Sequence, residues 1–230
     1  MLIIDAGHGG WDPGGGSNSY FKEKDLALKI SKYEHNRFNE LGIPSVLVRD
    51  DDITITPNDR LNRIAKLGAD RLDILISNHI NTGGSSGGEV IYSLRGDNEL
   101  PDMIAKELNL AGLPIRNVYQ RAGKTGKDYY FILRGTAPEK AMIIEYGFAD
   151  NDADTKRLLY EWPKLAEAVV KAITSYYQLP YTPPKYNIHI VKPNESLYTI
   201  SKKYGISINE IKKLNNLKSD TIYPYMELYV

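Results

Sequence analysis

Short apolar runs that alternate with helical patterns constrain the fold of this chain more than any other feature. The runs lie at residues 2–5, 43–48, 73–79, 88–93, 129–133 and 141–146. They are rich in branched and aromatic side chains and are bounded by Gly, Pro or Asp, which is typical of strands. Helical patterns lie between several of them. Because nearly continuous apolar strands need cover on both faces, the pattern predicts an α/β fold with a twisted, mostly parallel six-stranded sheet flanked by helices.

A proline-rich segment divides the chain. Residues 178–185 contain three prolines, which cannot continue a helix and favour an extended spacer. Beyond it, residues 186–230 show a strand, two helices and a final strand. The sequence therefore predicts a large domain at residues 1–177, a linker at 178–185 and a small βααβ domain at 186–230.

Composition excludes several classes of protein. The formal net charge of zero argues against a nucleic-acid partner. No apolar run approaches the roughly 20 residues that span a bilayer, so we expect no membrane insertion. The chain has no cysteine, which removes disulfides, thiolate nucleophiles and cysteine-ligated zinc. The first residues lack the pattern of a signal peptide, so we expect synthesis in the cytoplasm without one.

Four side chains at strand ends or helix starts could carry chemistry. His8 follows the first apolar run and His79 ends the third. Glu23 opens the first helix, and Glu145 lies inside an apolar strand. Sites of open α/β sheets lie at the carboxyl ends of strands. Taken singly, the histidines fit a glycine turn or a hydrogen-bonded rim, and Glu23 fits the positive end of a helix dipole. Glu145 is harder to explain, because a buried carboxylate needs a partner.

The four residues together indicate a metal-dependent hydrolase. A His-Glu-His set with an open position is the ligand pattern of catalytic zinc. A further carboxylate that does not bind the metal can take a proton from the attacking water.

The motifs of residues 1–177 resemble the zinc-dependent N-acetylmuramoyl-L-alanine amidases of the type-3 family. The matching stretches are Asp5…Gly7-His8-Gly9-Gly10, Glu23-Lys24-Asp25-Leu26, Ser77…His79…Asn81, Gly87-Gly88 and Glu145-Tyr146-Gly147-Phe148…Asn151. The resemblance implies that His8, Glu23 and His79 bind Zn²⁺ and that Glu145 is the catalytic acid and base. Ala6 replaces the usual proline, and Asn78 and Ile80 flank His79 where smaller or aliphatic residues are commoner.

The resemblance also implies the reaction, hydrolysis of the amide between N-acetylmuramic acid and the L-alanine of the peptidoglycan stem peptide. We expect further substrate contacts at Asn81, Gly87, Gly88 and Arg121.

Residues 186–230 resemble a LysM module, which binds glycans that contain N-acetylglucosamine. The match runs from Tyr186 through Ser196-Leu197-Tyr198 to Ile222-Tyr223-Pro224. The resemblance implies glycan contacts at Asn194, Glu195, Ser196, Leu197, Tyr223 and Pro224. Asn194-Glu195 replaces the usual Gly-Asp pair, and Tyr225-Met226 replaces a turn led by glycine.

Several alternatives stay open at this point. A phage endolysin is the preferred setting, with action on the cell wall after release, and a host mother-cell autolysin is its alternative. A zinc carboxypeptidase or sugar deacetylase acting on the wall would differ in its product. A non-enzymatic wall-binding protein would not need the four residues intact.

Overall fold

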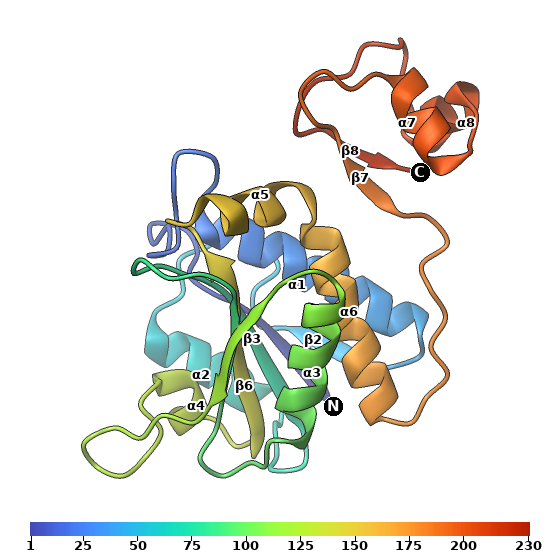
Figure 1. The fold of residues 1–230 in the computed structure, drawn as a ribbon. Helices are drawn as coiled ribbons and strands as arrows, with labels where there is room; N and C mark the ends of the chain where they lie inside the picture. The colour runs from blue at the N-terminus through green and yellow to red at the C-terminus, as the bar shows by residue number, and fades with distance from the viewer.

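A six-stranded sheet in the order β2-β1-β3-β6-β4-β5 lies at the centre of the larger part of the molecule (Figure 1). The computed structural model describes all residues from 1 to 230. The strands are β1 (Leu2–Ala6), β2 (Ser45–Leu47), β3 (Ile74–Asn81), β4 (Gly88–Tyr92), β5 (Ile115–Tyr119) and β6 (Lys140–Phe148). Strand β4 runs antiparallel to β6, and every other pairing is parallel. The predicted six-stranded, mostly parallel sheet is confirmed.

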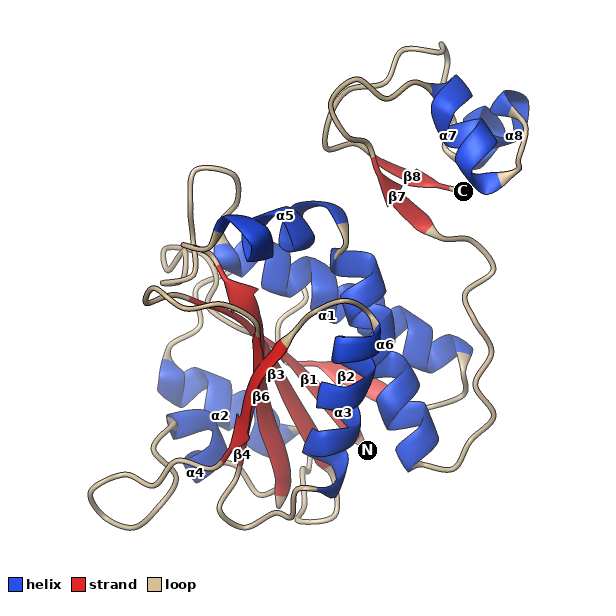
Figure 2. Ribbon diagram, in the orientation of Figure 1, coloured by secondary structure: helices blue, strands red, loops and turns tan.

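Helices cover both faces of this sheet (Figure 2). The larger layer holds α1 (Glu23–Glu40), α3 (Glu99–Leu110) and α6 (Trp162–Tyr176). They pack on one set of alternating strand residues, among them Ile4, Ile76 and Ile144. On the other face, α2 (Pro57–Lys66) and α4 (Phe131–Gly135) pack on residues that include Leu75 and Ile143. Helix α5 (Asp152–Tyr160) follows β6 directly.

One predicted strand is wrong. Residues 129–133 contribute to α4 instead, where Ile132 and Leu133 bury their side chains against the second face of the sheet. The sixth strand is β5, which the sequence pattern did not indicate. As an edge strand it is only partly buried, so it lacks the continuous apolar run that marks a central strand. A short apolar run by itself does not separate a buried helix from a strand.

Strand register places several polar side chains at one end of the sheet. Asp5 on β1 lies opposite Ser77 on β3. His79 on β3 lies opposite Glu145 on β6, and Glu89 on β4 lies opposite Glu145 on the other side. Because β1, β3 and β6 are parallel, their carboxyl ends meet at the same edge.

The C-terminal part forms a separate small unit with its own core. It contains β7 (Ile188–Ile190), α7 (Leu197–Tyr204), α8 (Ile208–Leu214) and β8 (Glu227–Tyr229). The two strands pair antiparallel, and six buried residues, including Leu197, Ile200 and Ile211, fill the core. A capping box between Ser196 and Thr199 begins α7. In the whole chain, no helix is both long and apolar enough to cross a membrane.

Asp154 on α5 anchors the two backbone segments that flank the polar end of the sheet. Its carboxylate is fully buried and accepts the N–H groups of Gly87, at 2.7 Å, and Phe148, at 3.0 Å. Arg157 donates to the other carboxylate oxygen at 2.8 Å.

We expect Asp154→Ala to lower the free energy of unfolding by about 3 kcal/mol, because it leaves buried N–H groups without an acceptor. Urea unfolding measures the change. Asp152→Ala is the matched control, because that carboxylate is exposed in the first turn of the same helix and contributes about 0.5 kcal/mol. Equal losses in both variants would contradict this role.

Candidate active site

The loop after β1 is held by two buried arginines. Arg60 on α2 pairs with Asp5 and donates to the carbonyl oxygens of Ala6 and His8, each at 2.7 Å. Arg49 donates to the carbonyl oxygen of Gly7 at 2.9 Å. These bonds stabilise an unusual backbone, since His8 has φ of 60°, in the left-handed region that non-glycine residues rarely adopt. The loop therefore presents the His8 imidazole in one fixed direction.

Three predicted metal ligands meet at this end of the sheet. Nε2 of His8 lies 3.1 Å from Oε1 of Glu23, and Nδ1 of His79 lies 3.0 Å from the same oxygen. One ligand atom from each residue lies within 4.8 Å of the others. Residues 8, 23 and 79 come from a loop, a helix start and a strand end, so the fold brings together what the sequence keeps apart.

Further contacts orient these three side chains. The other ring nitrogen of His8, Nδ1, lies 2.7 Å from Oδ2 of Asp12. Nε2 of His79 lies 3.1 Å from the hydroxyl of Ser77, which donates to Asp5. Partners of this kind fix the orientation and tautomer of imidazoles that bind metals.

The charges at the site are strongly coupled. Burial would lower the pKa of His8, but its hydrogen bonds with Glu23 and Asp12 outweigh burial and raise the pKa to about 9. Burial would raise the pKa of Glu23, but hydrogen bonds with His79 and His8 hold it well below its usual range. The Glu23 carboxylate is therefore ionised and flanked by two imidazoles.

Glu145 faces the same cavity without joining this cluster of hydrogen bonds. Its Oε2 atom is buried and has no hydrogen-bond partner in the protein. Burial raises the pKa of Glu145 to about 7. The cavity has a volume of about 280 Å³, and His8, His79, Arg60 and Tyr130 also line it. A carboxyl group with a pKa near neutrality can both take and return a proton.

The residues present fit a zinc ion. Two imidazole nitrogens and one carboxylate oxygen form the three-ligand set of catalytic zinc sites, which leave a further position open. Glu145 lines the same cavity, and its buried Oε2 atom has no hydrogen-bond partner.

The predicted substrate residues of the large domain lie around this cluster in different ways. Asn81, at the end of β3, donates to Glu89 at 3.0 Å. Gly87 and Gly88 do not line the cavity. Their Cβ atoms would lie 2.5 Å from Pro114 and 2.7 Å from Leu113, which gives both glycines a packing role.

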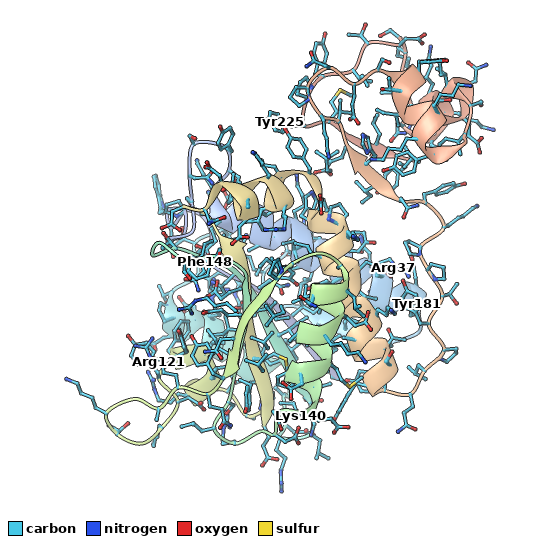
Figure 3. All side chains as sticks on the ribbon, in the orientation of Figure 1. Arg37, Arg121, Lys140, Phe148, Tyr181 and Tyr225 are labelled. Carbon is cyan, nitrogen blue, oxygen red and sulfur yellow. The ribbon has the colours of Figure 1, made fainter.

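Arg121 lies on the segment between β5 and α4 (Figure 3). Its guanidinium carbon is 3.9 Å from the ring centroid of Tyr129, and the next residue, Tyr130, lines the cavity. Its contact with substrate stays a prediction.

The predicted glycan residues of the small unit divide into two groups. Glu195, Ser196 and Leu197 serve the fold: Glu195 bonds to His189 at 2.7 Å, Ser196 caps α7, and Leu197 is buried in the core. Asn194, Tyr223 and Pro224 are exposed, as is Ser196. The exposed group is therefore the one available to a ligand.

Several residues around the site gave no signal in the sequence. Arg49 and Arg60 are charged residues in polar surroundings, which resemble solvent-exposed positions until the fold buries them. Asp12 and Tyr130 lie outside the quoted motifs. Asn78, by contrast, was noticed as a departure. It lies on the opposite face of β3, where it donates to buried Glu34 at 2.6 Å.

Comparison with known proteins supports both parts of the chain. The family model described as N-acetylmuramoyl-L-alanine amidase matches residues 2–175, and the LysM domain model matches residues 189–230. The uncharacterized protein YqiI of Bacillus subtilis is 33% identical over 180 residues, which cover 76% of this chain and 84% of YqiI. The sporulation-specific N-acetylmuramoyl-L-alanine amidase of that species is 32% identical over 165 residues, covering 68% of this chain but 59% of that relative.

The fold agrees with solved amidases. The N-acetylmuramoyl-L-alanine amidase from Clostridium difficile 630 superposes with a TM-score of 0.66 at 28% identity, covering 77% of this chain and 96% of that one. The sheet, the site and these matches define a hydrolase that acts on peptidoglycan. The chain belongs to the N-acetylmuramoyl-L-alanine amidase family, and it also carries a LysM domain.

Gly7 provides a test of how closely the site is packed. A Cβ atom there would lie 2.3 Å from Cε1 of His79, whereas a Cβ atom on Gly15 would meet only Thr82, at 3.7 Å. We expect Gly7→Ala to displace His79 and to lower kcat/KM on peptidoglycan by about 10²-fold, because small misplacements of catalytic groups have effects of this size.

Gly15→Ala is the control and should keep most of its activity. Circular dichroism establishes that both variants are folded before their rates are compared. Similar rates in the two folded variants would show that the contact with His79 does not matter.

Proposed function

We propose that this chain is a zinc-dependent amidase in which His8, Glu23 and His79 bind Zn²⁺ and Glu145 moves the proton. The observation that supports the proposal is the common cavity, which is lined by Glu145 and by the two histidines that contact Glu23. Bound zinc supplies Lewis-acid activation of water and of the scissile carbonyl.

The remaining steps belong to the protein. Glu145 accepts the proton of the attacking water and returns it to the leaving amine, since an amine anion is a poor leaving group. Asp12 and Ser77 keep the two imidazoles in orientation. Tyr130 and Phe131 add aromatic side chains to the lining of the cavity.

The proposed substrate is the amide between N-acetylmuramic acid and L-alanine of the stem peptide. Digestion of purified peptidoglycan tests this reaction, because mass spectrometry separates the possible products. We expect free stem peptides with N-terminal alanine. Release of single amino acids would identify a carboxypeptidase, and release of acetate a deacetylase. No product at all would identify a wall-binding protein without activity.

Metal removal tests the cofactor. We expect chelation to abolish the release of stem peptides and added Zn²⁺ to restore it, with one zinc bound per chain by metal analysis. His79→Ala should lose both bound zinc and turnover, because it removes one of three ligands. Full activity in excess chelator with no bound metal would exclude zinc from the mechanism.

Glu145→Gln separates proton transfer from metal binding. We expect the variant to keep its fold and its zinc while losing at least about 10²-fold in activity, the low end for a positioned acid or base. Melting temperature, bound zinc and muropeptide release are measured on one sample. Near-normal turnover in a folded, zinc-loaded variant would contradict the role of Glu145.

We also propose a division of labour between the predicted domains, with hydrolysis in residues 1–177 and wall attachment in residues 186–230. A chain of residues 1–177 should still cleave soluble muropeptides but sediment less with insoluble walls, because tethering raises the effective concentration at the polymer. Equal sedimentation of the two forms would mean that the LysM domain does not attach the enzyme.

The proposed setting is a phage endolysin, with a host autolysin as the alternative. Both would cleave the same bond with the same residues, so the time of expression separates them. Transcripts late in phage infection support the first, and transcripts during sporulation without phage support the second.

A further inference from the structure

The LysM domain is seated directly on the amidase domain through a few defined contacts. The rings of Tyr225 and Tyr160 stack with centroids 5.8 Å apart and planes 16° from parallel. Lys192 lies 5.5 Å from the Tyr160 centroid, and Lys29 on α1 pairs with Glu227 on β8. Figure 3 shows Tyr225 extending from the small unit toward α5.

The backbone of Tyr225 indicates that its position matters. Its φ is 71°, in the left-handed region, which costs a non-glycine residue of order 1 kcal/mol. In the LysM pattern, a turn led by glycine stands at this position. A tyrosine at this position has a strained backbone, but its aromatic ring packs between the two domains.

The seated domains do not fill the space between them. A cavity of about 260 Å³ remains, and side chains of both domains line it. Trp162 is buried in its lining, and Tyr20 and Tyr225 are 63% and 49% exposed. Interfaces between domains are a common location for ligand sites lined by aromatic residues with a few polar groups.

The polar groups of this cavity favour a neutral ligand rich in hydroxyl groups. Asp25 and Glu227 supply two carboxylates, and Lys29 supplies one ammonium group that already pairs with Glu227. The excess negative charge disfavours a stem peptide that ends in carboxylates. Carboxylates accept hydrogen bonds from hydroxyl and amide groups, and the negative face of an aromatic ring attracts the C–H groups of a pyranose.

The cavity also lies close to the catalytic site. Tyr20 precedes Glu23 by three residues, and Asp25 and Lys29 follow it on the same helix. At 1.5 Å per residue, these positions are about 3–9 Å along the helix from the start of the site. The two sites are therefore linked by the first turns of one helix.

We propose that the junction cavity binds one N-acetylhexosamine unit of the peptidoglycan glycan strand, so that both domains hold the same strand. This proposal rests on the proposed peptidoglycan substrate. It concerns a site that neither domain contains alone.

Fluorescence of Trp162 in the full-length protein tests the proposal. The chain has two tryptophans, so a Trp11→Phe background leaves Trp162 as the only reporter. The probe is a soluble oligomer of N-acetylglucosamine. It lacks the amide between muramic acid and L-alanine, so the result is independent of whether the site hydrolyses that bond, which muropeptide digestion decides. We expect a saturable change in emission.

Two tyrosines of similar exposure serve as matched variants. Tyr20→Ala, in the amidase domain, should weaken binding of the oligomer about tenfold, because it removes an aromatic wall of the cavity. Tyr229 is 51% exposed but lies outside the cavity and is not among the predicted glycan contacts, so Tyr229→Ala should leave the Trp162 response unchanged.

Three results would overturn the proposal. The first is a Trp162 signal that does not respond to the oligomer. The second is a response that Tyr20→Ala keeps and Tyr229→Ala loses, which would place the ligand on the LysM domain alone. The third is displacement of the oligomer by free stem peptide, which would make the cavity a peptide site.

Discussion

The site depends on the buried ion pair between Arg60 and Asp5. An unpaired charge at either position would be strongly destabilising, because both side chains are almost completely buried. The pair also helps to orient the imidazole rings of both His8 and His79. Arg60 holds the carbonyl oxygen of His8, and Asp5 accepts from Ser77, whose hydroxyl contacts His79. One electrostatic contact between α2 and β1 therefore fixes two side chains that lie 71 residues apart in the sequence.

The sequence was most informative where chemistry and topology coincide. His8, His79 and Glu145 were chosen because polar residues at the ends of apolar strands must share one edge of a parallel sheet, and the structure brings them to one cavity. Arg60 and Arg49 could not be chosen in this way. An arginine in a helix or a loop looks exposed until tertiary packing supplies its carbonyl partners. The sequence did not predict edge strand β5 for a related reason. A half-exposed strand has a mixed composition and lacks a continuous apolar run.

In the small domain, the structure explains one departure from the LysM pattern, at Tyr225. In the sequence, Tyr225 was only an unusual residue where a glycine was expected. In the structure, its ring stacks on Tyr160, and the same contact closes one side of the junction cavity. The proline-rich segment between the domains sets their reach, whereas the side chains at the junction set their orientation.

The place of β6 in the sheet has a consequence for biosynthesis. β3 and β4 are consecutive along the chain, yet they do not pair, because β6 lies between them. Both edges must stay open on the ribosome until residues 140–148 emerge, and long-range pairings of this kind form slowly. The same strand delivers Glu145. A nascent chain therefore completes its sheet and places Glu145 in one event, and a shorter intermediate lacks both the central strand and this carboxylate.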